Sequence, residues 1–396
     1  MNLINSINLI KLWLPSAISI LLLSIELPLI AFLMLDSPID ITHNYTVAIA
    51  YLMFANAIIY PIAPFVVKNG NNSHSLKWGM AIIISVFFIF NGYVSLFIDN
   101  HSVREVSHFL SISLIFIGLK RYLQACLIIN KYTLPISQSA FVRVFITCTM
   151  SILLLNQELN ARYDILVVFS ILSGGFVEVI LLGCYLYKRN IKLLENKIQV
   201  IPHKENISSY LALVLLFASY LASNLLLMIF FKDDEWVTQY WTMIFTLSSL
   251  SIYPLLDVDS IFIKIKQDYP SDLYGFCITV SIVTSIFSLI ILFVLSTLIK
   301  SESLIQYIYT PYFFISFIIT PFLWNVRSIM RIEYILSNQS GITICTIIGA
   351  FVLSLSLGRL LNIFSPVILF NMIILAEILI YFLYKWMKKY IKSIVS

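Results

Sequence analysis

Charged side chains are scarce in this sequence: Asp, Glu, Lys and Arg together make up 11% of the residues, whereas 60% are hydrophobic. Soluble globular domains carry about 25% charged residues, so this composition excludes a soluble protein. The apolar runs are continuous and lack the alternating pattern of an outer-membrane barrel, which excludes transmembrane strands. We therefore expect an all-α membrane protein.

Sequence features typical of several enzyme classes are also missing. The five cysteines all fall inside apolar segments and form no Cys-x-x-Cys pair, which argues against a metal site or a disulfide framework. There is no Gly-rich phosphate loop, so we expect no ATP hydrolysis. A membrane glycan polymerase needs a large outer loop and an acyltransferase a membrane-embedded His, and neither is found. We expect no enzyme, no cofactor and no metal.

Twelve apolar segments follow one another along the chain, each long enough to cross a hydrocarbon layer of roughly 30 Å. They lie at 12–35, 45–67, 78–98, 106–129, 133–155, 164–187, 209–231, 236–256, 273–299, 308–336, 342–362 and 364–386. A basic stretch, KRNIKLLENKIQVIPHKENI, separates the sixth segment from the seventh. We therefore expect a six-helix lobe at 1–187, a cytoplasmic linker at 188–207 and a second six-helix lobe at 208–396.

The distribution of basic residues predicts the orientation in the membrane. With the N-terminus in the cytoplasm, 19 of the 25 Lys and Arg residues fall in cytoplasmic loops and flanks, five fall on the other side, and Arg143 lies inside the membrane. Lys120 and Arg331 count among the cytoplasmic flanks. The positive-inside rule then places both termini in the cytoplasm. The net charge of +5 reflects this topology and not nucleic-acid binding.

The two halves show a weak internal repeat. The matched residues are the Tyr-Pro pairs at 60–61 and 253–254, Arg121 with Arg327, and Glu178 with Glu377. Because each half has an even number of segments, both enter the membrane in the same direction, as in a parallel repeat with a cleft between two bundles. This architecture suits alternating access. The alternative is a chance alignment of low-complexity apolar sequence.

Ionisable residues inside the segments are the candidate functional residues, because each costs about 2.5–3.5 kcal/mol at mid-bilayer. The helical rise places Arg121, Arg143 and Glu178 at one level of the first half, and Arg327 and Glu377 at the same level of the second. One interpretation is a structural Arg–Glu pair within each bundle. The other is a cationic lining for an anionic substrate, with the carboxylates as proton acceptors.

Glu26 lies deeper, on a segment without a basic residue at that level. Pro28 cannot donate a hydrogen bond to the carbonyl of Ser24, so we expect a weakened turn beside the carboxylate. An acidic residue beside a broken turn is typical of a cation or proton site, and a buried carboxylate without a basic partner can exchange protons near neutral pH. The alternatives are packing or helix capping. The counterpart in segment seven, Asn224, is neutral.

Two segments resemble a known family. The opening WLPSAISILLLSIELPLIAFLM resembles the first helix of multidrug and toxic compound extrusion (MATE)-like exporters of the multidrug/oligosaccharidyl-lipid/polysaccharide (MOP) superfamily. It is most similar to the bacterial relatives of the progressive ankylosis protein. The segment RYLQACLIINKYTLPISQSAFVRV (121–144) resembles their helix 4 to helix 5 signature, with Ala125 in place of a Gly. The matching residues are Arg121, Tyr122, Gln124, Leu127, Ile128 and Arg143.

This resemblance implies a two-lobed exporter in the cytoplasmic membrane of a bacterium, with a cleft formed by helices 1, 2, 7 and 8. It also implies coupling to a proton or sodium gradient. We expect a monomer that exports a small anionic molecule. The alternative is an O-antigen-type flippase for a lipid-linked oligosaccharide. A major-facilitator transporter is disfavoured, because KNGNNSHSLK (68–77) stands where its Gly-x-x-x-Asp-Arg loop belongs.

Overall fold

The computed structural model describes residues 3–33, 39–155, 163–192, 207–215, 217–218, 251–298, 302–337, 339–361 and 365–395. Within these ranges the regular secondary structure is helical and includes no strand. The N-terminal helices are α1 (Leu3–Leu33), α2 (Ile39–Ile59), α3 (Ile62–Asn69), α4 (Ser73–Phe97), α5 (His101–Ile129), α6 (Leu134–Leu155) and α7 (Tyr163–Lys188). The later elements are η1 (Tyr253–Leu255), α10 (Val258–Asp268), η2 (Pro270–Asp272), α11 (Leu273–Leu298), α12 (Glu302–Ile308), α13 (Pro311–Leu336), α14 (Ser340–Leu360) and α15 (Pro366–Val395).

Nine helical stretches of the described chain are long and apolar enough to cross a membrane. They confirm the predicted segments at 45–67, 78–98, 106–129, 133–155, 164–187, 273–299, 308–336, 342–362 and 364–386. The first predicted segment, 12–35, overlaps α1, a helix of 31 residues that ends at Leu33. The segments at 209–231 and 236–256 fall mostly outside the described residues and stay predictions. The chain is thus a multi-pass, all-helical membrane protein.

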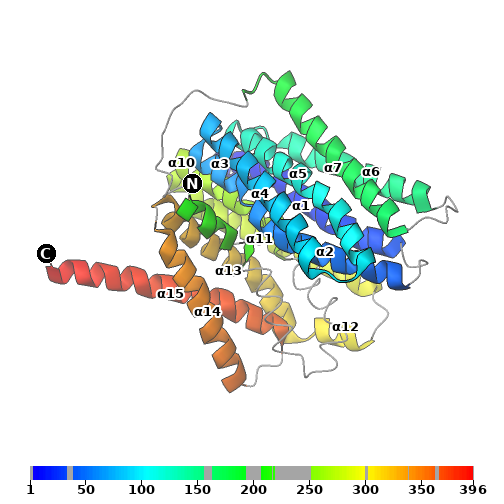
Figure 1. Cartoon of the computed structure of the whole chain (residues 1–396). Helices are drawn as coiled ribbons and strands as arrows, with labels where there is room; N and C mark the ends of the chain where they lie inside the picture. The colour runs from blue at the N-terminus through cyan, green and yellow to red at the C-terminus, as the bar shows by residue number, and fades with distance from the viewer. Residues whose placement is uncertain are drawn as a thin grey trace. The chain divides into compact units, whose positions relative to one another are not determined.

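The chain divides into two compact units. The N-terminal unit is Lys11–Pro202, and the C-terminal unit is His203–Ser396 together with Met1–Ile10. Within the N-terminal unit, α7 packs against both α5 and α6, as Figure 1 shows, and α2 and α4 also pack against α5. Within the C-terminal unit, α13 packs against α11 and α15, and α14 packs against α15. One central helix, α5 or α13, therefore contacts most of the others in its unit.

A Tyr-Pro pair interrupts the chain before a short helix in each unit. Because Pro has no N–H, α2 ends at Ile59 and α3 begins at Ile62, on either side of Pro61. Pro254 likewise lies in the 3-10 helix η1, just before α10. The short helix α3 packs against α5, and α10 packs against α13. Each of these short helices therefore lies beside the helix that carries the predicted arginine of its unit.

The distribution of side chains is the reverse of that in a soluble protein. Phe88, Leu96 and Leu360 are 67%, 77% and 78% exposed, as expected where lipid replaces water as the solvent. Acidic, basic and hydroxyl side chains are instead buried between the helices. An ionisable group in such an interior needs a partner of opposite charge, so the contacts of the buried charges define the candidate site.

Candidate functional site

Four charged side chains form one buried network in the N-terminal unit. Arg143 of α6 donates from Nε to Glu26 Oε1 (3.1 Å) and from Nη2 to Glu26 Oε2 (2.7 Å). Its third nitrogen, Nη1, donates to Glu178 Oε2 of α7 (3.1 Å). Lys120 Nζ of α5 lies 2.6 Å from the other oxygen of Glu178. Two carboxylates and two cations alternate, so the network is neutral in sum when all four are ionised.

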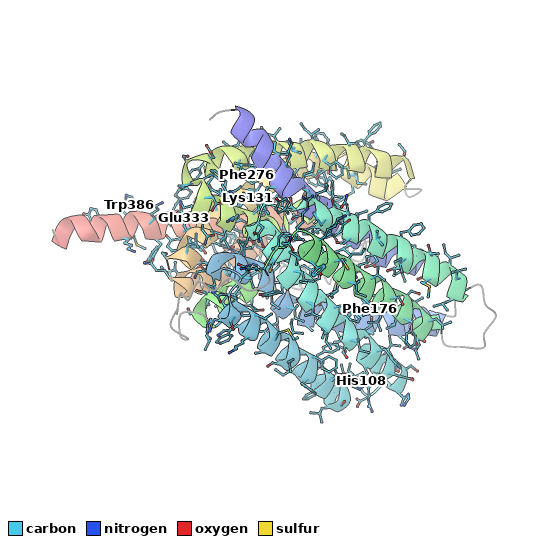
Figure 2. All side chains as sticks on the ribbon, turned by 90° about the horizontal axis from the view of Figure 1, so that it is seen from above. His108, Lys131, Phe176, Phe276, Glu333 and Trp386 are labelled. Atoms are coloured by element: carbon cyan, nitrogen blue, oxygen red, sulfur yellow. The ribbon has the colours of Figure 1, made fainter. Side chains whose placement is uncertain are left out.

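Helix packing holds this network in place. Thr147, one turn after Arg143 on α6, donates its hydroxyl to Glu26 Oε1 at 2.9 Å. On the facing helix α7, Gly174 lies so close that an added Cβ would meet Thr147 Oγ1 at 2.1 Å and the Arg143 carbonyl oxygen at 2.9 Å. Only the absence of a side chain at Gly174 allows this approach. In Figure 2, His108 and Lys131 lie near opposite ends of α5, and Lys120 belongs to the stretch between them.

The surroundings of Glu26 differ from the sequence-based expectation. The prediction that Glu26 lacks a basic partner is wrong, because Arg143 binds both of its carboxylate oxygens. Arg143 also pairs with Glu178, which agrees with the interpretation of an Arg–Glu pair within the bundle, although Arg143 bridges two carboxylates instead of one. The expected break beside Pro28 is not seen, since α1 continues from Leu3 to Leu33. Asn224 lies outside the described residues.

Arg121 joins α5 to the end of α2. Its Nε donates to the carbonyl oxygen of Tyr60 (3.1 Å), and its guanidinium lies over the Tyr60 ring at 4.8 Å. Its Nη1 donates to Gln124 Oε1, one turn away on α5 (3.1 Å). Pro64, four residues after Tyr60, has no N–H to donate to the carbonyl oxygen of Tyr60, and Arg121 donates to that oxygen. Arg121 thus holds the break at Pro61 in place, while its chain neighbour Lys120 reaches Glu178.

A second buried ionic cluster lies in the C-terminal unit. Arg331 of α13 donates from Nε and Nη2 to the two carboxylate oxygens of Glu377 on α15. Arg327, one turn earlier on α13, has its Nη1 4.0 Å from Glu377 Oε2 and its guanidinium 3.9 Å above the Trp324 ring. The prediction that Arg327 is the partner of Glu377 is therefore only partly right. The bidentate partner is Arg331, which is fully buried and was expected at the cytoplasmic flank.

Asp259 of α10 also faces these arginines, and its side chain is only 1% exposed. Burial raises the pKa of its carboxyl to about 6, and the neighbouring Asp257 adds to this rise. Arg331, a hydrogen bond with Ser328, and Arg327 all act to lower this pKa without cancelling the effect of burial. Asp259 and Glu377 are thus two acidic groups that lie near two basic groups, Arg327 and Arg331.

Sequence reasoning missed Lys120, Arg331 and Asp259. The spacing of Arg327 and Arg331 was an available signal, because residues four apart share one helix face and either can reach the same partner. No such signal marked Lys120, which precedes Arg121, or Asp259, which lies outside the predicted segments. Across the described residues, no group of three or more His, Cys, Asp or Glu side chains is placed to hold a metal ion.

A search of protein-family models finds no match to this sequence, and neither does a search of curated proteins. Several solved structures do match over nearly the whole chain. An outward-facing multidrug resistance MATE family transporter of the MOP superfamily aligns with a TM-score of 0.74 at 10% identity, covering 98% of this chain and 96% of the other. A point mutant of the MATE transporter VcmN from Vibrio cholerae aligns at 0.70 and 11% identity, covering 98% and 97%.

A MOP superfamily transporter from Pyrococcus furiosus aligns at 0.71 and 9% identity, covering 99% of this chain and 97% of the other. At such identities the comparison concerns the fold. These neighbours are transporters and not enzymes. By its fold, this chain has the architecture of the MATE transporters of the MOP superfamily.

Proposed function

We propose that the chain is a secondary-active exporter of a small anionic molecule, driven by a proton or sodium gradient across the cytoplasmic membrane of a bacterium. In this proposal a monomer with two six-helix lobes, 1–187 and 208–396, works by alternating access, with the linker 188–207 and both termini in the cytoplasm. The observation that carries the proposal is the buried network of Glu26, Arg143, Glu178 and Lys120 within a MATE-like fold.

The network supports gradient coupling because its charge changes when a cation binds. A proton or sodium ion at Glu26 would weaken the two hydrogen bonds from Arg143 and leave that guanidinium with Glu178 alone. The helices α1 and α6 are joined by these bonds, so cation binding would loosen one from the other. A ligand shifts a conformational equilibrium only through such a difference in contacts between two states.

The arginines support an anionic cargo. Arg121 and Arg327 are each buried, and each guanidinium lies against an aromatic ring. An anion that displaced the ring or the carbonyl contact would gain charge-assisted hydrogen bonds. Two of the neighbouring structures are MATE transporters, one of them a multidrug resistance transporter, which favours a soluble cargo over a lipid-linked one.

The proposal is tested with the full chain in proteoliposomes loaded with a mixture of mono- and dicarboxylates and sugar phosphates. A proton or sodium gradient is imposed, and the retained anions are measured by mass spectrometry. We expect a gradient to accelerate the loss of at least one anion, and Glu26→Gln to abolish that acceleration. Glu333→Gln is the control, because Glu333 is partly exposed and pairs with Lys266 and Lys385 at the surface.

If Glu26→Gln fails to fold, Thr147→Val is the second variant, because it removes one hydrogen bond to Glu26 and keeps every charge. Gradient-driven flux equal to wild type in both variants would exclude Glu26 as the coupling residue. No gradient-driven loss of any anion from wild-type vesicles would exclude the exporter. Transfer of a fluorescent lipid-linked oligosaccharide between leaflets in those same vesicles would then establish the flippase alternative.

A further inference from the structure

Two carboxylates compete for the arginines of α13 in the C-terminal unit. Glu377 takes both Nε and Nη2 of Arg331 and lies 4.0 Å from Nη1 of Arg327. Asp259, on α10, faces the same two arginines from another element. The N–H groups of Arg331 that donate to Glu377 cannot donate to Asp259 at the same time.

In this geometry, Asp259 is the carboxylate with the poorer contacts. Its Oδ1 is buried and has no hydrogen-bond partner among the described residues. Nε and Nη2 of Arg327 are likewise buried without hydrogen-bond partners in this part of the chain. A charged carboxylate left in this condition is costly, because the hydrogen bond with Ser328 offsets only part of its desolvation.

We infer that Asp259 is a proton-binding site of the C-terminal unit, separate from the Glu26–Arg143 network, and that Glu377 controls its protonation by holding the arginines of α13. While Arg331 is bound to Glu377, Asp259 takes up a proton at mildly acidic pH. When an arginine moves from Glu377 to Asp259, Asp259 releases this proton and Glu377 becomes the less well paired carboxylate. In this step the O–H bond of Asp259 breaks, and the proton passes to bulk water, where hydronium forms the new O–H bond.

The two units differ in a way that this inference explains. In the N-terminal unit, every charged group of the network has a partner of opposite charge within 3.1 Å. In the C-terminal unit, the same number of acids and bases is present, but Glu377 has most of the contacts described. The groups that face Asp259 are Arg327, Ser328 and Arg331 of α13, with Asp257 before α10. Burial is the largest influence and leaves the pKa of Asp259 raised to about 6, although the two arginines and the Ser328 hydrogen bond lower it.

Infrared difference spectroscopy of the full-length protein in detergent tests this inference. A protonated carboxylic acid has a carbonyl stretch that an ionised one lacks, and it shifts in D₂O. We expect this band to appear as the pH is lowered through about 6, and to be lost in Asp259→Asn. Asp268→Asn is the matched control: Asp268 lies on the same helix, pairs with Lys264 at 3.3 Å and is partly exposed.

The competition itself is tested by Glu377→Gln. Removal of this carboxylate leaves Asp259 as the acidic partner of both arginines, so the carbonyl band should titrate at a lower pH. If this variant does not fold, Asp257→Asn is used, because loss of the neighbouring negative charge should shift the band in the same direction. A band that persists in Asp259→Asn, or no titrating band in wild type, would overturn the proton site. An unshifted band in the folded Glu377→Gln variant, or in Asp257→Asn where that replaces it, would overturn the control by competition.

This test involves no transport measurement. Its failure would leave the exporter proposal standing, and failure of the exporter proposal would leave the proton site standing.

Discussion

Arg143 can bind two carboxylates at once because a guanidinium presents five N–H donors in a planar fork. Its three nitrogens donate hydrogen bonds to Glu26 on α1 and Glu178 on α7. A lysine carries three donors on one atom and cannot span the two acids in this way. The identity of the side chain, and not only its charge, therefore determines whether the network can form.

The variant Arg143→Lys keeps the charge and tests the geometry. We expect the free energy of unfolding to fall by roughly 1.5–3 kcal/mol, because at least one charge-assisted hydrogen bond is lost in a buried site. Thermal unfolding in detergent measures this change. Arg189→Lys is the control, since Arg189 is exposed and contacts only the Tyr132 ring in the described structure. Equal losses in the two variants would contradict a geometric role for Arg143.

Asp259 gives the stability a defined pH dependence. Its pKa in the folded protein is raised from 3.8 to about 6, so the unfolded chain loses this proton first as the pH rises. The stabilising contribution is complete below pH 3.8 and is lost as the pH rises to about 6, on the order of 3 kcal/mol in total. We expect the stability difference between wild type and Asp259→Asn to fall over this window. A difference that rises or stays constant with pH would contradict the raised pKa.

At the residue scale, sequence reasoning predicted which charges are buried better than which charges meet. Scarcity of charge made Glu26, Arg143 and Glu178 stand out, and all three are buried. Their partners depend on how far each helix is rotated and tilted, and hydropathy contains no such information. Depth calculated from the helical rise separated Glu26 from Arg143, yet the long arginine side chain spans that difference.

At the element scale, α6 and α7 approach each other closely because Gly174 has no side chain. Such close approach is typical of membrane helices, which associate through van der Waals packing and interhelical hydrogen bonds. This close packing places Arg143 of α6 within hydrogen-bond distance of Glu178 on α7, while Thr147 of α6 donates to Glu26. The network thus depends on backbone packing as well as on charge.

The variant Gly174→Ala tests this dependence. The added Cβ would lie 2.1 Å from Thr147 Oγ1, so α6 and α7 must separate or Thr147 must rotate away from Glu26. Overpacking of this kind costs about 1–3 kcal/mol, which thermal unfolding in detergent would reveal. Gly183→Ala on α7 is the control, because an added Cβ there meets nothing within 4 Å. A Gly174→Ala variant as stable as Gly183→Ala would contradict the close packing.

Elements were easier to predict than contacts because hydropathy is a local property of the sequence. The nine predicted segments that lie within the described residues agree with observed helices, within a few residues at most of their ends. The Tyr-Pro pairs were noted as part of a repeat, but the short helices α3 and α10 that follow them were not predicted. These helices have only 8 and 11 residues, and their existence depends on packing against α5 and α13.

For the whole molecule, the membrane orientation determines which side of the gradient each charged network meets. The positive-inside rule depends on basic residues in short loops, because moving Lys or Arg across the membrane is unfavourable. The predicted linker 188–207 contains five Lys and Arg residues, whereas the stretch at Asp233, Asp234 and Glu235 is acidic. If the linker lies in the cytoplasm, an exporter must release its cargo on the side of that acidic loop.

Reporter fusions test this orientation directly. Alkaline phosphatase is active only outside the cytoplasm, and green fluorescent protein fluoresces when it is fused on the cytoplasmic side. We expect fusions within 188–207 and after Lys392 to fluoresce and to lack phosphatase activity, and a fusion after Glu235 to show the opposite. Phosphatase activity within the linker would reverse the topology and, with it, the direction of transport. Replacing the linker lysines by glutamine should weaken the preference, because the same positive charges that fix the topology would then be absent.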